Sequence, residues 1–401
     1  MQNEKGDAMR IPRHVQIILD RLTDAGFDAY VVGGSLRDSL LGNAAHDWDV
    51  TSGATPDQVI SLFPDMHVIP TGLKHGTVTV VSKGDPIEIT TFRTDGEYKD
   101  SRRPESVTFS NNVEDDLSRR DFTVNAMAYN ERRGLVDLFG GKDDLERKII
   151  RCVGDPEKRF SEDALRIMRA FRFSSQLGFE IEKETLLAAH SMKNGLKNIA
   201  KERISNEFLR LLEGVAAKDS LLKMGDILNV IIPETLDIQR FEKIEGLQRD
   251  AIVRLSFLLC GLSTESVRNA AHCLKLSSKQ TQKLMKLSSP PTENELKDLT
   301  EEGARRILAA YGENTLAAAE ISSLVYNIDA ASLTILRRIV ENDPPVTLDR
   351  LAVNGSDLIN EGIANGRDVG RILCSLLNEV IADPNKNERA SLLEIARKIM
   401  S

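Results

Sequence analysis

The sequence is poor in cysteine and contains no long apolar run. Its four cysteines are scattered without CxxC spacing, which argues against a zinc site and predicts reduced thiols. No apolar run approaches the ~18 residues that a membrane-spanning helix needs, and the N-terminal residues lack the apolar core of a signal peptide. We therefore expect a cytoplasmic protein with no membrane segment.

Positive charge is also in deficit, because the formal net charge is −8. This balance argues against a protein that coats nucleic acid over its whole surface. It leaves room for a local basic groove, since affinity depends on the Lys and Arg side chains near phosphates. With 401 residues, of which 41% are hydrophobic and 28% charged, the chain is typical of a globular protein with two or more domains.

Residues 30–52 carry the first chemical signal, in the run YVVGGSLRDSLLGNAAHDWDVTS. The pattern predicts a buried strand, a diglycine turn, a short helix and a second strand. Asp47 and Asp49 lie two residues apart on that second strand, so both carboxylates point to one face. Their repulsion favours a bound cation, and Mg²⁺ prefers carboxylate oxygens shared with phosphates.

Gly33 and Gly34 allow the backbone to approach a phosphate at the start of the following helix. A phosphate cradle and a carboxylate pair on one short unit indicate phosphoryl or nucleotidyl transfer. Either motif alone is more often an ordinary turn or a solvated strand end, so the interpretation depends on their combination.

The rest of the chain divides into an α/β part and a helical part. Helices are predicted at 13–25 and 55–63, and strands at 67–70, 77–81, 87–92, 107–110 and 126–129. From Ser161 onward a 3.6-residue periodicity predicts helices and strand signals vanish. Paired prolines near 290 and 344 stop helices. We predict domains at 1–152, 153–215, 216–341 and 342–401.

Two further groups extend the candidate site. Glu88 alternates with apolar neighbours on a predicted strand and would supply a third carboxylate to a two-metal site; a solvated strand residue is the alternative. Arg119 and Arg120 adjoin Asp121, and strand alternation would send one guanidinium to the site, where it could grip a triphosphate or ribose. Residues 92–109 between two strands form a long polar loop.

The segment EDALRIMRAFRF, residues 162–173, predicts an amphipathic helix with Ser161 as its N-cap. Its polar face would carry four charged side chains at i, i+3 steps: Asp163, Arg166, Arg169 and Arg172. A solvated face with an Asp163–Arg166 salt bridge is one interpretation. Three arginines beside few acids suit a polyphosphate better.

The polarity of this Asp and Arg pair suggests base recognition. An Asp accepts hydrogen bonds and an Arg donates them. Cytosine and adenine both present an amino donor beside a ring-nitrogen acceptor, whereas uracil and guanine present the reverse pattern. Such a pair on one helix would therefore select C and A without a template.

Seven motifs occur in a specific order: GGSLRD, DWDV, TGLKHGTVTV, EITTFRTDGEYKDSRRPESVTF, RRDFTVNAMA, EDALRIMRAFRF and KERISNE. In this combination the chain resembles the bacterial class II CCA-adding enzymes, which are tRNA nucleotidyltransferases of the polymerase-β-like superfamily. The resemblance is dense over residues 1–215 and extends weakly to residues 351–359. It implies an α/β nucleotidyltransferase head with a mixed sheet, followed by an all-α C-terminal half of neck, body and tail.

The resemblance also implies an activity and its residues. The activity is template-independent addition or repair of the 3′-terminal CCA of tRNA from CTP and ATP. Asp47 and Asp49 would bind Mg²⁺, with Glu88 as the third catalytic carboxylate. The implied nucleotide-binding residues are Gly34, Arg37, Arg120, Asp163, Arg166, Arg169 and Arg172.

Within that set, the resemblance separates three roles. Gly34 and Arg37 would contact the phosphates, Asp163 and Arg166 would read the base edge, and the remaining arginines would face the ribose or triphosphate. Residues 201–207, KERISNE, would brace the base-reading helix. The helical half would hold the acceptor arm of tRNA.

Three alternatives remain open at this point. An A-adding tRNA nucleotidyltransferase or a poly(A) polymerase shares most of these motifs. A non-catalytic RNA-binding protein on the same fold is the alternative from a different class, although the intact carboxylate pair argues against it. The sequence leaves the oligomeric state unknown.

Overall fold

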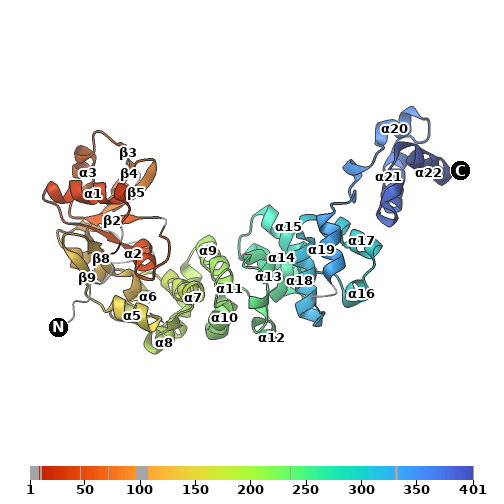
Figure 1. The fold of residues 1–401 in the computed structure, drawn as a ribbon. Helices are drawn as coiled ribbons and strands as arrows, with labels where there is room; N and C mark the ends of the chain where they lie inside the picture. Colours follow the sequence, from red (N-terminus) through yellow and green to blue (C-terminus); the bar gives the residue numbers. More distant parts are fainter. Residues whose placement is uncertain are drawn as a thin grey trace, which may run out of the picture. The chain divides into compact units, whose positions relative to one another are not determined.

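The computed structural model of the chain describes residues 9, 11–45, 47–70, 72–95, 107–234, 236–329 and 333–400. The chain forms two compact units, Met1–Pro233 and Glu234–Ser401. Figure 1 shows that strands and helices mix in the first unit, whereas the second is built from helices. The predicted fold class, an α/β part followed by a helical part, is confirmed.

A seven-stranded mixed sheet forms the centre of the first unit, in the order β3-β4-β5-β2-β1-β8-β9. Its strands are β1 (Ala29–Val32), β2 (Asp49–Ser52), β3 (His67–Ile69), β4 (Thr77–Ser82), β5 (Asp85–Thr91), β8 (Met127–Asn130) and β9 (Gly134–Asp137). All neighbouring strands are antiparallel except β2 and β5, which are parallel. This parallel pair places Asp49 opposite Glu88.

Both faces of the sheet are covered. On one face pack α1 (Arg13–Asp24) and α3 (Pro56–Leu62), and α1 buries Val15, Ile18, Leu19 and Leu22 as its periodicity predicts. On the other face, Tyr30 and Val32 of β1 pack against Leu117 of α4 (Val113–Ser118). Alternate residues of β1 therefore enter two separate apolar clusters, which fixes the register of the strand that leads into the site.

Two short helices and one short strand pair complete the α/β part of the first unit. α2 (Gly33–Leu40) follows β1 directly, and α5 (Gly141–Arg147) follows β9. β6 (Arg93–Asp95) pairs with β7 (Val107–Phe109). The polar loop predicted between these strands falls mainly on residues 96–106, outside the described residues.

The helices that follow complete the first unit. They are α6 (Pro156–Glu162), α7 (Leu165–Leu177), α8 (Lys183–Ser191), α9 (Lys201–Leu212), α10 (Ala217–Met224) and α11 (Leu228–Ile231). Two sequence predictions are wrong here. Ser161 lies inside α6, whose N-cap is Asp155. A strand, β11 (Glu180–Ile181), lies in the part where only helices were expected and pairs with β10 (Ile149–Ile150).

The second unit is helical throughout its described residues. Its helices are α12 (Ile238–Phe241), α13 (Ala251–Leu259), α14 (Thr264–Cys273), α15 (Ser278–Leu287), α16 (Glu293–Leu296), α17 (Glu301–Tyr311), α18 (Thr315–Tyr326), α19 (Thr334–Glu341), α20 (Gly355–Asn360), α21 (Arg367–Ala382) and α22 (Arg389–Met400). The Arg305 guanidinium of α17 donates to the carbonyls of Ile381 (2.5 Å) and Ala382 (2.7 Å), capping the end of α21. The four-part domain division remains a prediction.

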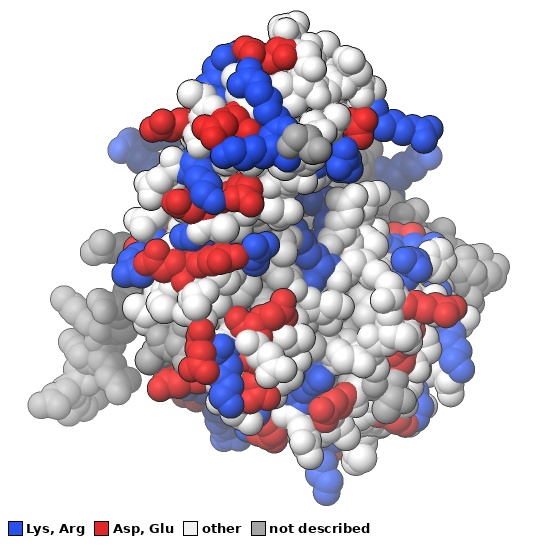
Figure 2. All heavy atoms as spheres, turned by 90° about the vertical axis from the view of Figure 1, so that its right-hand side faces the viewer, with Lys and Arg blue, Asp and Glu red and all other residues white. Residues whose placement is uncertain are grey.

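Charge on the second unit is mixed in sign. Figure 2 shows Lys and Arg side chains lying among Asp and Glu side chains on the face that it presents. Many of them form exposed ion pairs, such as Arg338 with Glu301 (2.6 Å) and Arg397 with Glu361 (2.9 Å). All four cysteines are free, as predicted. None of the described helices has both the length and the apolar character needed to span a bilayer.

Because α7 packs closely against the end of α9, we predict that a larger side chain at Gly214 destabilises the protein. The Ser175 hydroxyl of α7 donates to the Leu211 carbonyl (2.7 Å), and a Cβ built on Gly214 would lie 2.6 Å from the Ser175 carbonyl oxygen. Gly214→Ala should therefore lower the free energy of unfolding by about 2 kcal/mol, measured by thermal unfolding followed by circular dichroism.

The matched control is Gly370→Ala in α21, where an added Cβ meets nothing within 4 Å. Alanine is the better helix former, so this variant should be neutral or slightly stabilised. Equal destabilisation of both variants would contradict the packing argument.

Candidate active site

A cavity of about 740 Å³ opens in the first unit between α2, the start of β2, α7 and α9. Eight arginines and five aspartates line it. Every predicted nucleotide-binding and metal-binding residue is on its wall: Gly34, Arg37, Asp47, Asp49, Arg120, Asp163, Arg166, Arg169 and Arg172. Glu88 alone among the predicted site residues lies outside this cavity.

The diglycine forms one end of the cavity, as the sequence predicts. Gly33 has φ +74° and opens α2, and a Cβ added there would lie 3.5 Å from both the Arg120 Nη1 and the Asp49 Oδ2. Arg37 is buried and held in place, because its Nη1 donates to the Asn125 Oδ1 (2.8 Å) and its Nε to the Asp38 Oδ1 (2.9 Å). The backbone and Arg37 thus form a preorganised anion-binding wall.

Three carboxylates lie close to this wall. Asp49 is the first residue of β2 and Asp47 precedes the strand, which corrects the prediction that both lie on it. Glu88 is opposite Asp49 on β5, as expected of a third carboxylate from a neighbouring strand. Partial desolvation and the charges of Glu88 and Asp47 raise the pKa of Asp49 to about 6, against the opposing effect of Arg120.

The donor set fits a hard divalent cation that shares its coordination with a substrate. All three carboxylates remain exposed to solvent, and their mutual repulsion is what a cation would relieve. Within the described residues no group of three His, Cys, Asp or Glu side chains is arranged as a complete metal site. Phosphate oxygens would therefore have to supply further ligands, which is how Mg²⁺ is commonly bound.

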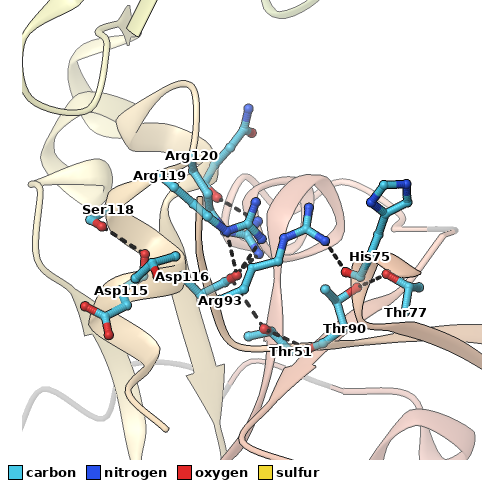
Figure 3. Close-up of polar contacts among 12 residues, drawn as sticks. Thr51, His75, Thr77, Thr90, Arg93, Asp115, Asp116, Ser118, Arg119 and Arg120 are labelled. Atoms are coloured by element: carbon cyan, nitrogen blue, oxygen red, sulfur yellow. Dashed lines mark hydrogen bonds and ion pairs between the residues drawn. The ribbon is translucent and has the colours of Figure 1, made fainter. Parts of the chain in front are cut away.

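A smaller cavity of about 180 Å³ lies against Asp49 and Glu88. Thr51, Thr77, Thr90 and Arg93 contribute to its walls, together with Arg119 and Arg120. Arg93 donates to the carbonyl oxygen of His75. Figure 3 shows these side chains gathered around the end of the sheet.

Asp116, which the sequence reasoning missed, organises the two adjacent arginines. It is fully buried on α4 and accepts from Arg119 Nη2 (2.5 Å), Arg120 Nη2 (3.0 Å) and the Thr51 hydroxyl (3.3 Å), as Figure 3 shows. Burial alone would raise the pKa of Asp116, but the two guanidinium groups outweigh it and lower that pKa. The prediction that only one arginine faces the site is wrong, since both line the cavity.

The α7 arginines are each paired with a carboxylate. Arg166 binds Glu162 (2.7 Å), Arg169 binds Asp121 (2.6 Å) and Arg172 binds Glu207 of α9 (2.6 Å). The expectation that these arginines have few acidic neighbours is therefore wrong. The acids come from α6, from the segment after α4 and from α9. Helical spacing indicates only Glu162, which precedes Arg166 by four residues.

Asp163 lies just before α7 in an extended conformation, with φ −142° and ψ 102°. Its Oδ2 accepts from Arg203 of α9 (3.1 Å) and its Oδ1 from the Leu165 amide (3.0 Å). Asp163 and Arg166 both line the cavity. The Arg166 amide donates to the Asp163 carbonyl (3.0 Å), and among the described contacts their side chains bind other residues and not each other. The pairing of Arg203 and Glu207 with residues of the α7 segment agrees with the bracing role expected of residues 201–207.

Phe173 is a second residue that the sequence reasoning missed. The guanidinium carbons of Arg37, Arg169 and Arg172 lie 5.2, 5.2 and 4.0 Å from the centre of its ring. A ring face attracts cations, so Phe173 holds three arginines from α2 and α7 around one point of the cavity. The sequence feature that could have indicated this role is an aromatic residue directly after the last arginine of the predicted helix.

Comparison with known families defines the class of protein. A model of the poly A polymerase head domain matches residues 29–151. A model described as "probable RNA and SrmB-binding site of polymerase A" matches residues 178–238, and one of tRNA nucleotidyltransferase domain 2 matches residues 248–396. With the sheet and the cavity described above, these matches define a nucleotidyltransferase.

Full-length relatives narrow the class to one family. The chain is 37% identical over 397 residues to a CCA-adding enzyme of Leuconostoc mesenteroides, covering 96% of each chain, and 38% identical over 383 residues to one of Lactobacillus helveticus, covering 92% of this chain and 93% of the relative. The solved CCA-adding enzyme of Bacillus stearothermophilus in complex with CTP has a TM-score of 0.81 and 33% identity, covering 96% of this chain and 98% of the other. The chain belongs to the family of CCA-adding enzymes.

A more distant solved structure shares the fold. The Thermotoga maritima CCA-adding enzyme complexed with tRNA_CCA has a TM-score of 0.70 and 21% identity, covering 98% of this chain and 97% of the other.

The Asp121–Arg169 ion pair predicts a pH-dependent contribution to stability. Burial would raise the pKa of Asp121, but Arg169 outweighs it and lowers that pKa to about 2. Asp121→Asn leaves a guanidinium without its buried counter-charge, so the free energy of unfolding should fall by about 3 kcal/mol at pH 7. We expect this from urea unfolding followed by the fluorescence of Trp48, the single tryptophan.

Because the native pKa is lowered, the contribution is complete above the unfolded-state pKa of about 4 and is lost as pH falls toward 2. The difference between wild type and variant should thus be constant from pH 7 to 5 and shrink in acid. Asp20→Asn, which removes an exposed ion pair with Arg132, is the control and should cost less than about 1 kcal/mol. A similar cost for both variants would refute the argument.

Proposed function

We propose that the cavity binds CTP and ATP in the presence of Mg²⁺ and transfers their nucleotidyl groups to the 3′ end of tRNA, building or repairing its CCA terminus. The observation that carries the proposal is one continuous cavity that joins the exposed carboxylates of Asp47 and Asp49 to the arginines of α7. The CTP complex of the Bacillus stearothermophilus relative supports a nucleotide in this cavity, and the tRNA_CCA complex of the Thermotoga maritima enzyme supports the acceptor.

The chemistry assigned to this chain is an in-line displacement. The 3′ hydroxyl of the acceptor attacks the α-phosphorus, the bond to the β-phosphate breaks, and pyrophosphate leaves. Asp47 and Asp49 would hold Mg²⁺, with Glu88 as the third carboxylate; the ion would lower the pKa of the attacking hydroxyl and neutralise developing charge. Gly34 and Arg37 would orient the triphosphate by hydrogen bonds from the backbone and a fixed guanidinium.

Arg120 would contact the ribose or α-phosphate, since its Nη1 lies beside Gly33. The small cavity against Glu88 is the entry we assign to the acceptor 3′ end, because Asp49 and Glu88 line it and the other described residues on its wall come from outside α7. The other arginines of the proposed site, Arg169 and Arg172, would face the triphosphate from α7.

Base choice would come from Asp163 and Arg166. The carboxylate of Asp163 has acceptor capacity beyond its bonds to Arg203 and Leu165, and Arg166 is fixed by Glu162 and by the Arg119 carbonyl (2.9 Å). A rigid acceptor beside a rigid donor complements the amino group and ring nitrogen of C or A. The carbonyl oxygen of U or G would instead face the carboxylate of Asp163, and the ring N–H would face the guanidinium of Arg166, so neither hydrogen bond would form.

Within the same class, addition of A alone or polyadenylation is the second candidate, because the head domain matches a poly A polymerase model. The experiment that separates these activities offers purified protein tRNA ending at position 73, 74 or 75, with each labelled nucleotide separately. Incorporation of CTP on the two shorter acceptors and of ATP on the longest supports CCA addition. Because all these substrates are intracellular, we also propose a cytoplasmic location.

Removing the carboxylate of either Asp47 or Asp49 should abolish addition without unfolding the protein. Asp47→Ala and Asp49→Ala each delete a metal ligand, and each also relieves the repulsion that raises the pKa of Asp49. We expect product formation from CTP and tRNA to fall below 1 part in about 1,000, with Trp48 fluorescence unchanged. The control is Asp57→Ala, which changes an exposed acid of α3 outside the cavity and should retain activity. Near-normal Mg²⁺-dependent activity in Asp47→Ala or Asp49→Ala would contradict the metal-binding assignment.

Replacing Asp163 should relax base selection more than it slows the reaction. Asp163→Ala removes the acceptor for the amino group, so discrimination between CTP and UTP should weaken by about 1–3 kcal/mol, or roughly fivefold to 150-fold. Competition assays with labelled CTP and UTP on tRNA lacking CCA measure the ratio. Arg203→Ala is the control, because it breaks the same ion pair but leaves the acceptor; equal loss in both variants would make the role of Asp163 structural.

A further inference from the structure

One arginine of the cavity has no role in the assignments above. Arg210 lies on α9, is exposed and lines the cavity. α9 directs charged side chains at positions 203, 207 and 210 toward α7, one or two turns apart. Arg203 binds Asp163 and Glu207 binds Arg172, whereas Arg210 has no hydrogen bond or ion pair to any residue that the structure describes.

The surroundings of Arg210 contain an excess of positive charge. Arg172 is buried beside it, and burial together with the charges of Arg169 and Arg210 lowers the pKa of Arg172 to about 10, although Glu207 opposes this. The two carboxylates at this end, Asp121 and Glu207, are each already engaged by another arginine. A third guanidinium at the same place therefore favours a bound anion.

The position along the cavity identifies which anion. Asp163 lies just before Leu165, the first residue of α7, and Arg172 is seven residues beyond Leu165, about 10 Å along the helix. If the base is read at Asp163, the phosphates extend toward Arg172 and Arg37, whose guanidinium groups both lie against Phe173. Arg210 is on the wall beyond them, at the end opposite the base.

We propose that Arg210 binds the γ-phosphate of the incoming nucleotide and holds the pyrophosphate product before its release. This inference rests on the proposed function, because it takes CTP and ATP as the ligands. A guanidinium is suited to the role, since it donates two parallel hydrogen bonds to phosphate oxygens and keeps its charge. Because Arg210 has no ion-pair partner among the described residues, binding a phosphate there breaks no ion pair with any of them.

The test compares nucleotides that differ only in the γ-phosphate. Calorimetric titrations with Mg²⁺ and without tRNA measure CTP and CDP binding to wild type, Arg210→Ala and Arg210→Lys. Arg210→Ala should bind CTP about tenfold more weakly and CDP unchanged, and Arg210→Lys should recover part of the loss. Lys183→Ala, which removes a positive charge from an exposed position of α8 outside the cavity lining, should match wild type.

Kinetics provide a second readout. The inhibition constant of pyrophosphate should rise by a similar factor in Arg210→Ala, while the KM for tRNA stays constant. Unchanged CTP affinity, or a rise in the KM for tRNA alone, would overturn the assignment and place Arg210 on the tRNA backbone instead. Failure of the wild-type protein to bind CTP at all would reject the proposed function itself, which is a distinct result.

Discussion

The site depends on pairing crowded arginines with carboxylates supplied by other elements. A guanidinium that loses water on burial is costly unless a counter-charge and hydrogen bonds replace that water. Asp116 of α4 forms ion pairs with two arginines. Asp121 forms one with Arg169, and Glu207 of α9 forms one with Arg172. Each pair joins two separate elements or closes a turn, so the same contacts that make the cavity basic also hold its walls together.

This pairing makes the proposed recognition rigid. Hydrogen bonds select a base only if the protein groups cannot turn to suit the wrong one, and each fixed bond removes that freedom. Arg166 is tied to α6 and to the Arg119 carbonyl, and Asp163 is tied to α9. A protein that selects a base without a template needs this kind of constraint, because no complementary strand supplies the geometry.

Sequence patterns predicted what depends on neighbours along the chain. The apolar stripe of α1, the diglycine start of α2 and the exposed Glu88 between buried residues of β5 all follow from local periodicity. The partners of Arg169 and Arg172, the contact of Phe173 with Arg37 and the β10–β11 pair depend on residues brought together from distant segments. Asp116 was within reach of sequence reasoning, because it precedes Arg119 and Arg120 by three and four residues, the spacing of one helical turn.

The local excess of positive charge explains how an acidic protein can bind a polyanion. The chain carries a net charge of −8, yet eight arginines face five aspartates on the cavity wall. Two of those aspartates, Asp47 and Asp49, belong to the proposed metal site and would be neutralised by the cation. Once they are neutralised, the remaining field favours the phosphates from both sides, so metal and nucleotide binding should reinforce each other. The acidic surface elsewhere then disfavours nonspecific adhesion of nucleic acid and leaves attraction concentrated where the reaction takes place.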